Sequence, residues 1–309
     1  MRIVFMGTPK AAVPSLERLL ADGHEVCAVY TQPDRPSGRG NKITYSPVKD
    51  FALQQNIPIF QPTKIRTPEA LEEFRSNSAD VAVVVAYGRI LPETFLTAFP
   101  KGAVNVHFSL LPKYRGAAPV NWAIVNGETE TGVTTMQMDV GLDTGDILLQ
   151  RHTTIGSDEN AIELMERLSL VGADLLSETL TNLADFPPIK QDETAATFAP
   201  IMKREDGLID WQLSASEIAN RVRGFQPFPA SFTFVNETKL TLWQANFVET
   251  TSDAQPGTIL AAYGDMFEVA CGGGSVLNIV EVQPEGKRRM PVRDFLNGAN
   301  PQIGTILGK

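Results

Sequence analysis

An asparagine and a histidine alternate with apolar residues at the end of a short β-branched run, at Asn105 and His107. Side chains two apart on a β-strand lie on the same face, so the pattern predicts that both point to one side. An amide can donate a hydrogen bond to a developing oxyanion, and an imidazole can exchange a proton near neutral pH. The pair is therefore suited to acyl-type transfer.

A third polar residue, Asp143, lies in a turn flanked by Gly141 and Gly145. Its carboxylate could orient the imidazole or relay its proton, so we interpret Asn105, His107 and Asp143 as a catalytic triad. Each residue taken alone also fits a structural role, the histidine in a core, the asparagine in a turn and the aspartate as a cap. The residues by themselves leave that alternative open.

Length and composition predict an ordinary globular protein. The chain has 309 residues, enough for about two domains, with 43% hydrophobic and 20% charged residues. No apolar run approaches the ~20 residues of a membrane span, and the chain opens directly into a strand pattern. We therefore expect a cytoplasmic protein with no membrane association. No heptad seam is evident, and we expect a monomer.

The two cysteines, Cys27 and Cys271, are far apart and have no CxxC partner. We expect both to be buried free thiols. With only three scattered histidines besides, no metal-ligand spacing is present, and we expect no metal.

The net charge of −9 argues against a protein that coats nucleic acid, because phosphate attraction needs positive charge. Two local basic clusters stand out nevertheless. One comprises Arg35, Arg39 and Lys42 in a loop rich in Pro and Gly, and the other comprises Lys287, Arg288 and Arg289. Taken alone, such clusters equally fit a solvated surface.

Strand and helix patterns alternate through the first half of the chain. A strand at residues 1–5, a helix carrying Leu16 and Leu19, and a strand at 26–30 form one repeat, and apolar runs at 81–86 and 104–106 add buried strands. The pattern predicts an α/β fold with a doubly wound, mostly parallel, Rossmann-like sheet. The turn after the first strand lacks the GxGxxG pattern, which disfavours a dinucleotide site.

The second half changes character. Ser157 is positioned to cap a long helix, and a stretch without periodicity follows. Ser214 and Glu217 then form a capping box for a short helix, and five short alternating runs predict a small OB-like β-barrel. We expect a catalytic domain at residues 1–186, a linker at 187–205 and a β-barrel domain at 206–309.

These motifs together resemble the methionyl-tRNA formyltransferase family over essentially the whole chain. The matching segments are residues 31–40, 46–49, 105–107, 109–112, 114–119 and 139–146. The resemblance implies transfer of a formyl group from 10-formyltetrahydrofolate to the α-amino group of methionine on initiator tRNA. The amine would attack directly through a tetrahedral intermediate, with Asn105, His107 and Asp143 as catalytic residues.

The resemblance also implies binding residues. Ser109, Leu110, Leu111 and Pro112 would line the folate site, although Phe108 stands where a small residue is expected. Arg39 would reach the tRNA acceptor end, with the other residues of the two basic clusters as further tRNA-binding candidates. The β-barrel domain would bind tRNA.

Other functions share part of this pattern. Enzymes that formylate glycinamide ribonucleotide or an amino sugar have the same Asn, His and Asp, and only the insertion at residues 32–42 and the domain from Asp206 favour a tRNA-borne acceptor. A folate hydrolase, in which water replaces the amine, and a non-catalytic tRNA- or folate-binding protein are the remaining alternatives.

Overall fold

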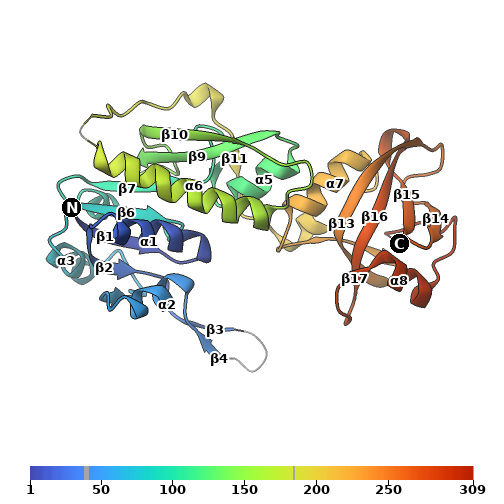
Figure 1. The fold of residues 1–309 in the computed structure, drawn as a ribbon, viewed down its shortest axis with the longest axis horizontal. Helices are drawn as coiled ribbons and strands as arrows, with labels where there is room; N and C mark the ends of the chain where they lie inside the picture. The colour runs from blue at the N-terminus through green and yellow to red at the C-terminus, as the bar shows by residue number, and fades with distance from the viewer. Residues whose placement is uncertain (38–41, 184, 309) are drawn as a thin grey trace. The chain divides into compact units, whose positions relative to one another are not determined.

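The computed structural model describes residues 1–37, 42–183 and 185–308 (Figure 1). Contacts between Cα atoms divide the chain into two units. The first comprises Met1–Pro119, Glu130–Thr154 and Met165–Ala199, and the second comprises Val120–Thr129, Ile155–Leu164 and Pro200–Lys309.

A seven-stranded sheet forms the centre of the first unit, in the order β10-β9-β7-β6-β1-β2-β5. Its strands are β1 (Arg2–Gly7), β2 (Glu25–Tyr30), β5 (Ile59–Phe60), β6 (Val81–Val85), β7 (Ala103–His107), β9 (Glu130–Gln137) and β10 (Ile147–Thr154). The strands from β7 to β5 in this order pair in parallel, whereas β9 runs antiparallel to both β7 and β10. The prediction of a mostly parallel sheet is confirmed.

Helices cover both faces of this sheet. The helices that accompany it are α1 (Val13–Ala21), α2 (Pro47–Gln54), α3 (Pro68–Ser76), α4 (Glu93–Leu96) and α6 (Ala161–Thr181). Figure 1 shows α1 and α6 on one side, where Arg18 of α1 hydrogen-bonds Asp174 of α6. On the other side, Phe74 and Phe95 join a buried cluster with sheet residues such as Val4. The fold is therefore doubly wound, as predicted.

The cap of α6 differs from the prediction. Asn160, rather than Ser157, accepts hydrogen bonds from the backbone N–H groups of Ile162 and Glu163, and the Glu163 carboxylate accepts one from the Asn160 N–H. This reciprocal pair is a capping box. The assignment to Ser157 was wrong because it placed the first helical turn too early in the chain.

Residues 187–199, which form most of the expected linker at 187–205, make ordered contacts within the first unit. Ile189 pairs with Ile147, a short 3₁₀ helix follows at Glu193–Ala195, and β11 (Phe198–Ala199) pairs in parallel with β8 (Arg115–Gly116). A further 3₁₀ helix spans Arg204–Gly207. Although this stretch is polar and lacks periodicity, part of its backbone is therefore hydrogen-bonded to strands of the first unit.

The remaining elements of the first unit are short. A 3₁₀ helix spans Lys10–Ala12, and β3 (Arg35–Ser37) pairs antiparallel with β4 (Lys42–Thr44). This hairpin extends next to α2 in Figure 1. The helix α5 (Pro119–Val125) belongs to the second unit apart from its first residue.

The second unit is built on an antiparallel sheet in the order β12-β13-β16-β15-β14, with β17 beside β16. Its elements are α7 (Ala215–Gly224), β12 (Ser231–Val235), β13 (Thr238–Thr251), β14 (Ile259–Tyr263), β15 (Met266–Ala270), a 3₁₀ helix (Gly272–Gly274), β16 (Ser275–Pro284), β17 (Met290–Pro291) and α8 (Val292–Ala299). Ser214 and Glu217 form the predicted capping box. The strand predictions are confirmed, whereas closure into an OB-like barrel stays a prediction.

The two thiols differ in burial. Cys271 is buried within the second unit's core, but Cys27 is partly exposed, so the prediction that both are buried was wrong for Cys27. Burial raises the pKa of both thiols, that of Cys271 to about 12.

Within the described ranges, no helix is long and apolar enough to cross a membrane. The same part of the chain contains no group of three or more His, Cys, Asp or Glu residues arranged to hold a metal ion.

Candidate active site

The carboxyl end of β7 carries the predicted asparagine and histidine. This strand lies between parallel β6 and antiparallel β9, so main-chain hydrogen bonds hold it on both sides. Asn105 is 9% exposed and His107 is 7% exposed. Water has little access to either side chain, so their hydrogen bonds must come from the protein or from a ligand.

One amide hydrogen of Asn105 is already used. Its Nδ2 donates to the carbonyl oxygen of Val84 at 3.1 Å. Because a carbonyl oxygen only accepts, this contact fixes which end of the amide faces β6. The second Nδ2 hydrogen remains for another acceptor, and Oδ1 is buried with no hydrogen-bond partner among the described residues. An amide with both capacities open suits a ligand that donates and accepts.

The imidazole of His107 is oriented by a main-chain group. Its Nε2 lies 3.0 Å from the carbonyl oxygen of Tyr114, which can only accept, so Nε2 carries a hydrogen. Its Nδ1 lies 3.7 Å from Oδ2 of Asp143. With Nε2 occupied, Nδ1 is the ring nitrogen that can exchange a proton, and a proton there would face the carboxylate.

Asp143 reaches the histidine from a constrained loop. Its φ of 54° lies in the left-handed region, which aspartate tolerates better than most residues. Its Oδ2 accepts a hydrogen bond from the Gly116 N–H at 2.8 Å, and the side chain is 16% exposed. Asp139 orders the same loop by accepting from the Gly141 N–H and the Thr144 hydroxyl. The carboxylate is therefore held by the backbone of β8.

A second polar cluster lies behind this loop and was not anticipated from the sequence. Arg115 is 2% exposed and donates to both carboxylate oxygens of Glu193, each at 2.8 Å. This fork-like pairing raises the pKa of Arg115 and lowers the pKa of Glu193. Gln191 lies between Arg115 and the Asp143 loop. The arginine at position 115 was itself a signal, because an arginine that becomes buried requires an acidic partner. The sequence does not indicate which of its many acidic residues is that partner.

The predicted folate-binding run follows β7 directly and is held by Thr134. The Thr134 hydroxyl donates to the Ser109 carbonyl and accepts from the Leu111 N–H. Ser109 and Leu111 are buried, whereas Leu110 and Pro112 are partly exposed. If this run contacts a ligand, the latter two residues are the accessible ones.

Phe108, the residue before that run, is buried next to α6. A Cβ atom placed on Gly172 of α6 would lie 3.4 Å from its ring. The large residue that follows β7 therefore lies against a glycine of the helix, and the absence of a side chain at Gly172 leaves room for its ring.

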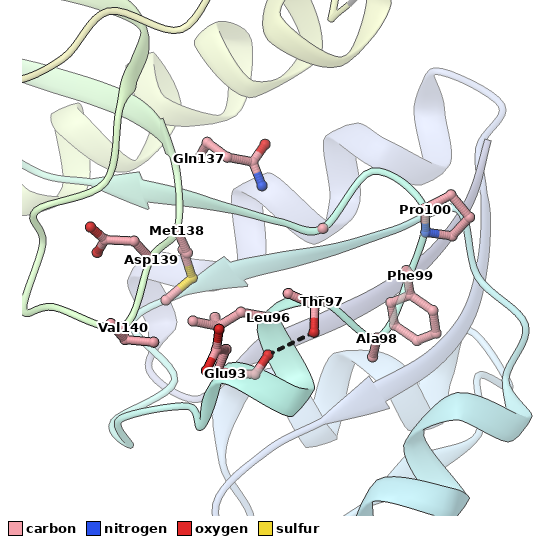
Figure 2. Close-up of a pocket in the computed structure, with 11 residues that line it drawn as sticks. Glu93, Leu96, Thr97, Ala98, Phe99, Pro100, Gln137, Met138, Asp139 and Val140 are labelled. Atoms are coloured by element: carbon pink, nitrogen blue, oxygen red, sulfur yellow. Dashed lines mark hydrogen bonds between the residues drawn. The ribbon is translucent and has the colours of Figure 1, made fainter.

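A pocket with a volume of about 710 Å³ lies beside the loop that carries Asp143. Figure 2 shows its lining, which comprises Glu93, Leu96, Thr97, Ala98, Phe99, Pro100, Gly102, Gln137, Met138, Asp139 and Val140. The pocket shares Asp139 and Val140 with the loop that carries Asp143, but its lining does not include Asn105, His107, Asp143 or residues 109–112. Its size suits a small organic ligand.

The basic candidates are divided between the two units. Arg35 is exposed on β3, the Lys42 backbone lies in β4, and Arg39 lies outside the described residues. Lys287, Arg288 and Arg289 are exposed in the turn between β16 and β17. Arg289 pairs with Glu281 and lies over the ring of Trp243, which offsets part of the positive charge of that cluster.

Two family models match this chain. The model described as formyl transferase matches residues 1–180, and the model described as formyl transferase, C-terminal domain, matches residues 201–300. The chain belongs to the formyl transferase family.

Curated relatives match over nearly their full length. A methionyl-tRNA formyltransferase of Citrifermentans bemidjiense is 53% identical, covering 100% of this chain and 97% of that protein. A methionyl-tRNA formyltransferase of Caldanaerobacter subterraneus is 50% identical, covering 99% of this chain and 100% of that protein.

The fold also matches solved structures. An N-formyltransferase from Helicobacter canadensis, in complex with folinic acid and dTDP-3-aminofucose, superposes with a TM-score of 0.68. The match covers 90% of this chain and 98% of that chain at 20% sequence identity. At this identity the match supports the fold.

Proposed function

We propose that this protein transfers a formyl group from 10-formyltetrahydrofolate to the α-amino group of methionine on initiator tRNA. The observation that carries the proposal is full-length identity of about 50% to proteins named methionyl-tRNA formyltransferase. The arrangement of Asn105, His107 and Asp143 supplies a chemical reason to expect acyl-type transfer at the end of β7.

The reaction makes three demands on the site. The methionine amine must attack without a proton, the formyl oxygen gains negative charge, and the departing folate nitrogen must receive a proton. His107 offers Nδ1 for proton exchange because Tyr114 occupies Nε2. The Asp143 carboxylate lies 3.7 Å from Nδ1 and can orient the ring. The substrate brings its own nucleophile, so no covalent enzyme intermediate is required.

Asn105 suits the developing tetrahedral centre. Its second Nδ2 hydrogen can donate to the oxyanion, and its unpaired Oδ1 can accept an N–H of the attacking amine. A buried acceptor without a partner costs ~1–3 kcal/mol, and the substrate would relieve this cost as it binds. The asparagine would thereby hold both reacting groups near one another.

Donor and acceptor would bind to different features. We propose that the folate donor binds at the run Ser109, Leu110, Leu111 and Pro112, through the partly exposed Leu110 and Pro112, and that its ring system extends into the pocket bounded by Val140. The tRNA would contact Arg35, Arg39 and Lys42 on one unit and Lys287, Arg288 and Arg289 on the other. A catalytic domain at 1–186, a linker at 187–205, and a tRNA-binding domain at 206–309 remain our proposed division. We also propose a metal-independent cytoplasmic monomer.

The test is formyl transfer with defined acceptors. Purified protein is incubated with 10-formyltetrahydrofolate and either initiator Met-tRNA, elongator Met-tRNA or no acceptor. Formylation of initiator Met-tRNA is expected, with much slower use of the elongator. Release of formate without an acceptor would instead favour a hydrolase, and binding without turnover would favour a non-catalytic protein.

A further inference from the structure

We propose that Gln191 is a positioning residue that holds the Asp143 loop against His107, and that Arg115 in turn orients Gln191. This inference rests on the proposed function and extends the site to a residue in the expected linker. It follows from four hydrogen bonds made by a single side chain that is 9% exposed.

The amide of Gln191 fills two roles at once. Its Nε2 donates to the carbonyl oxygen of Asp143 at 2.8 Å and to that of Gly145 at 2.7 Å. Its Oε1 accepts from Nε of Arg115 at 3.0 Å and from Nη2 at 2.8 Å. Because the arginine only donates and the carbonyls only accept, the amide has one satisfactory orientation. Gln191 therefore links the arginine to the loop without ambiguity.

The strand that carries Arg115 also contacts the loop. The next residue along β8 is Gly116, whose N–H donates to the Asp143 carboxylate. The main chain of Asp143 is therefore bound by Gln191, which Arg115 orients, and its side chain is bound by the residue that follows Arg115. Glu193 neutralises that arginine from the solvent side, since its own side chain is 68% exposed.

The same segment supports the other side of the histidine. The hydroxyl of Thr197 accepts from the Tyr114 N–H at 2.9 Å, and the Arg115 N–H donates to the Thr197 carbonyl at 2.9 Å. The Tyr114 carbonyl is the acceptor for His107 Nε2. Thr197 and Gln191 therefore support the two partners of the imidazole, Thr197 through Tyr114 and Gln191 through the loop that carries the Asp143 carboxylate.

A residue of this kind should affect the rate more than substrate binding. Asp143 holds a left-handed backbone conformation, and two of the loop's carbonyls lose their donor if Gln191 is replaced. The carboxylate would then sample positions away from Nδ1. A displacement of about 1 Å in a catalytic group can lower a rate ~10²-fold.

The experiment is a double-mutant cycle between Gln191→Met and Asp143→Asn, measured by formylation of initiator Met-tRNA. Methionine preserves length without hydrogen bonds. We expect Gln191→Met alone to lower kcat by ~10- to 100-fold with both KM values within about 2-fold. In the Asp143→Asn background the same change should lower kcat by less than about 2-fold, because the group being positioned is already altered.

Asp192→Ala is the matched control. Asp192 lies next to Gln191, and its carboxylate accepts hydrogen bonds from the N–H and the hydroxyl of Thr194. The substitution removes these bonds but leaves those of Gln191 in place, so kcat should stay within about 2-fold of wild type. Gln191→Glu keeps the acceptor for Arg115 but loses the donor. It should reproduce the loss of kcat if Gln191→Met does not fold.

Two results would overturn the inference. One is a folded Gln191 variant with wild-type kcat, and the other is an equal loss in both backgrounds, which would mark a general structural role. Failure of the wild-type protein to formylate any Met-tRNA would instead refute the proposed function, so the two failures can be told apart.

Discussion

The imidazole of His107 gives its Nε2 hydrogen to the carbonyl oxygen of Tyr114, 3.0 Å away. This contact determines that Nδ1, rather than Nε2, faces Asp143 at 3.7 Å. In the proposed reaction, Nδ1 is then the ring nitrogen left to exchange a proton, and its orientation is set before substrate binds.

His107→Ala and Asp143→Ala should each lower kcat for formyl transfer by ~10²- to 10⁴-fold, because they remove a proton-exchanging group or its partner. The double variant should lose little more than either single variant, since the pair acts as a unit. Steady-state kinetics would measure this. His152→Ala, at an exposed histidine, is the control and should retain activity. Independent, multiplicative losses would contradict coupling.

Asn105→Ala should lower kcat by ~10²- to 10³-fold through loss of an oxyanion donor. It also leaves the buried Val84 carbonyl without this donor, so unfolding free energy should fall by ~1–3 kcal/mol. Urea denaturation would give the second quantity. Asn182→Ala removes a bond to the Glu178 carbonyl and should spare the rate. If Asn105→Ala reduced stability but not kcat, the asparagine would be structural.

Glu193→Gln should change stability in a pH-dependent manner. Hydrogen bonding to Arg115 lowers the pKa of Glu193 below its ordinary value of 4.5. A carboxylate with a lowered pKa contributes stability that is present above the unfolded-state pKa and lost as pH falls through the folded-state pKa. The variant's Tm deficit should therefore be full at pH 6 and shrink toward pH 3. A deficit independent of pH, measured by calorimetry, would exclude the ionic contribution.

Arg35→Ala and Arg39→Ala should raise KM for initiator Met-tRNA and leave KM for the folate donor unchanged. If each arginine contacts one phosphate, its loss should reduce the slope of log affinity against log salt by ~0.7–0.9. Filter binding of initiator Met-tRNA at salt concentrations from about 50 to about 200 mM would measure the slope. Lys10→Ala, which removes an exposed lysine paired with Glu166, should leave tRNA affinity unchanged. Unchanged slopes in both arginine variants would argue against phosphate contacts.

Val140→Asp should raise KM for the folate donor by ~10-fold or more, because it places a charge on the wall of a mixed polar and apolar pocket. Val140→Leu keeps the apolar wall and is the matched control, expected within about 2-fold of the wild-type KM. Equal donor KM values for the two variants would show that the pocket does not take the donor. Residues 109–112 would then be the remaining candidate for donor contacts.

Local patterns in the chain were sufficient for most of the fold. Alternation around Asn105 and His107 predicted a strand with both polar residues on one face, and Ser214 with Glu217 predicted a capped helix. Both predictions depend on residues within one turn or one strand. The N-cap of α6 was assigned to Ser157, three positions before the actual cap, Asn160. Several residues that can cap a helix precede α6, and the local sequence does not show which of them does so.

The sequence by itself determined the residue types available for formyl transfer and the elements that present them. Only the tertiary structure decided which groups meet. Nothing local indicates that Nε2 of His107 is occupied by Tyr114, or that Gln191, in a stretch without periodicity, bonds the Asp143 loop. A strand or helix repeats its geometry along the chain, whereas a hydrogen bond between distant segments depends on where the whole fold places them.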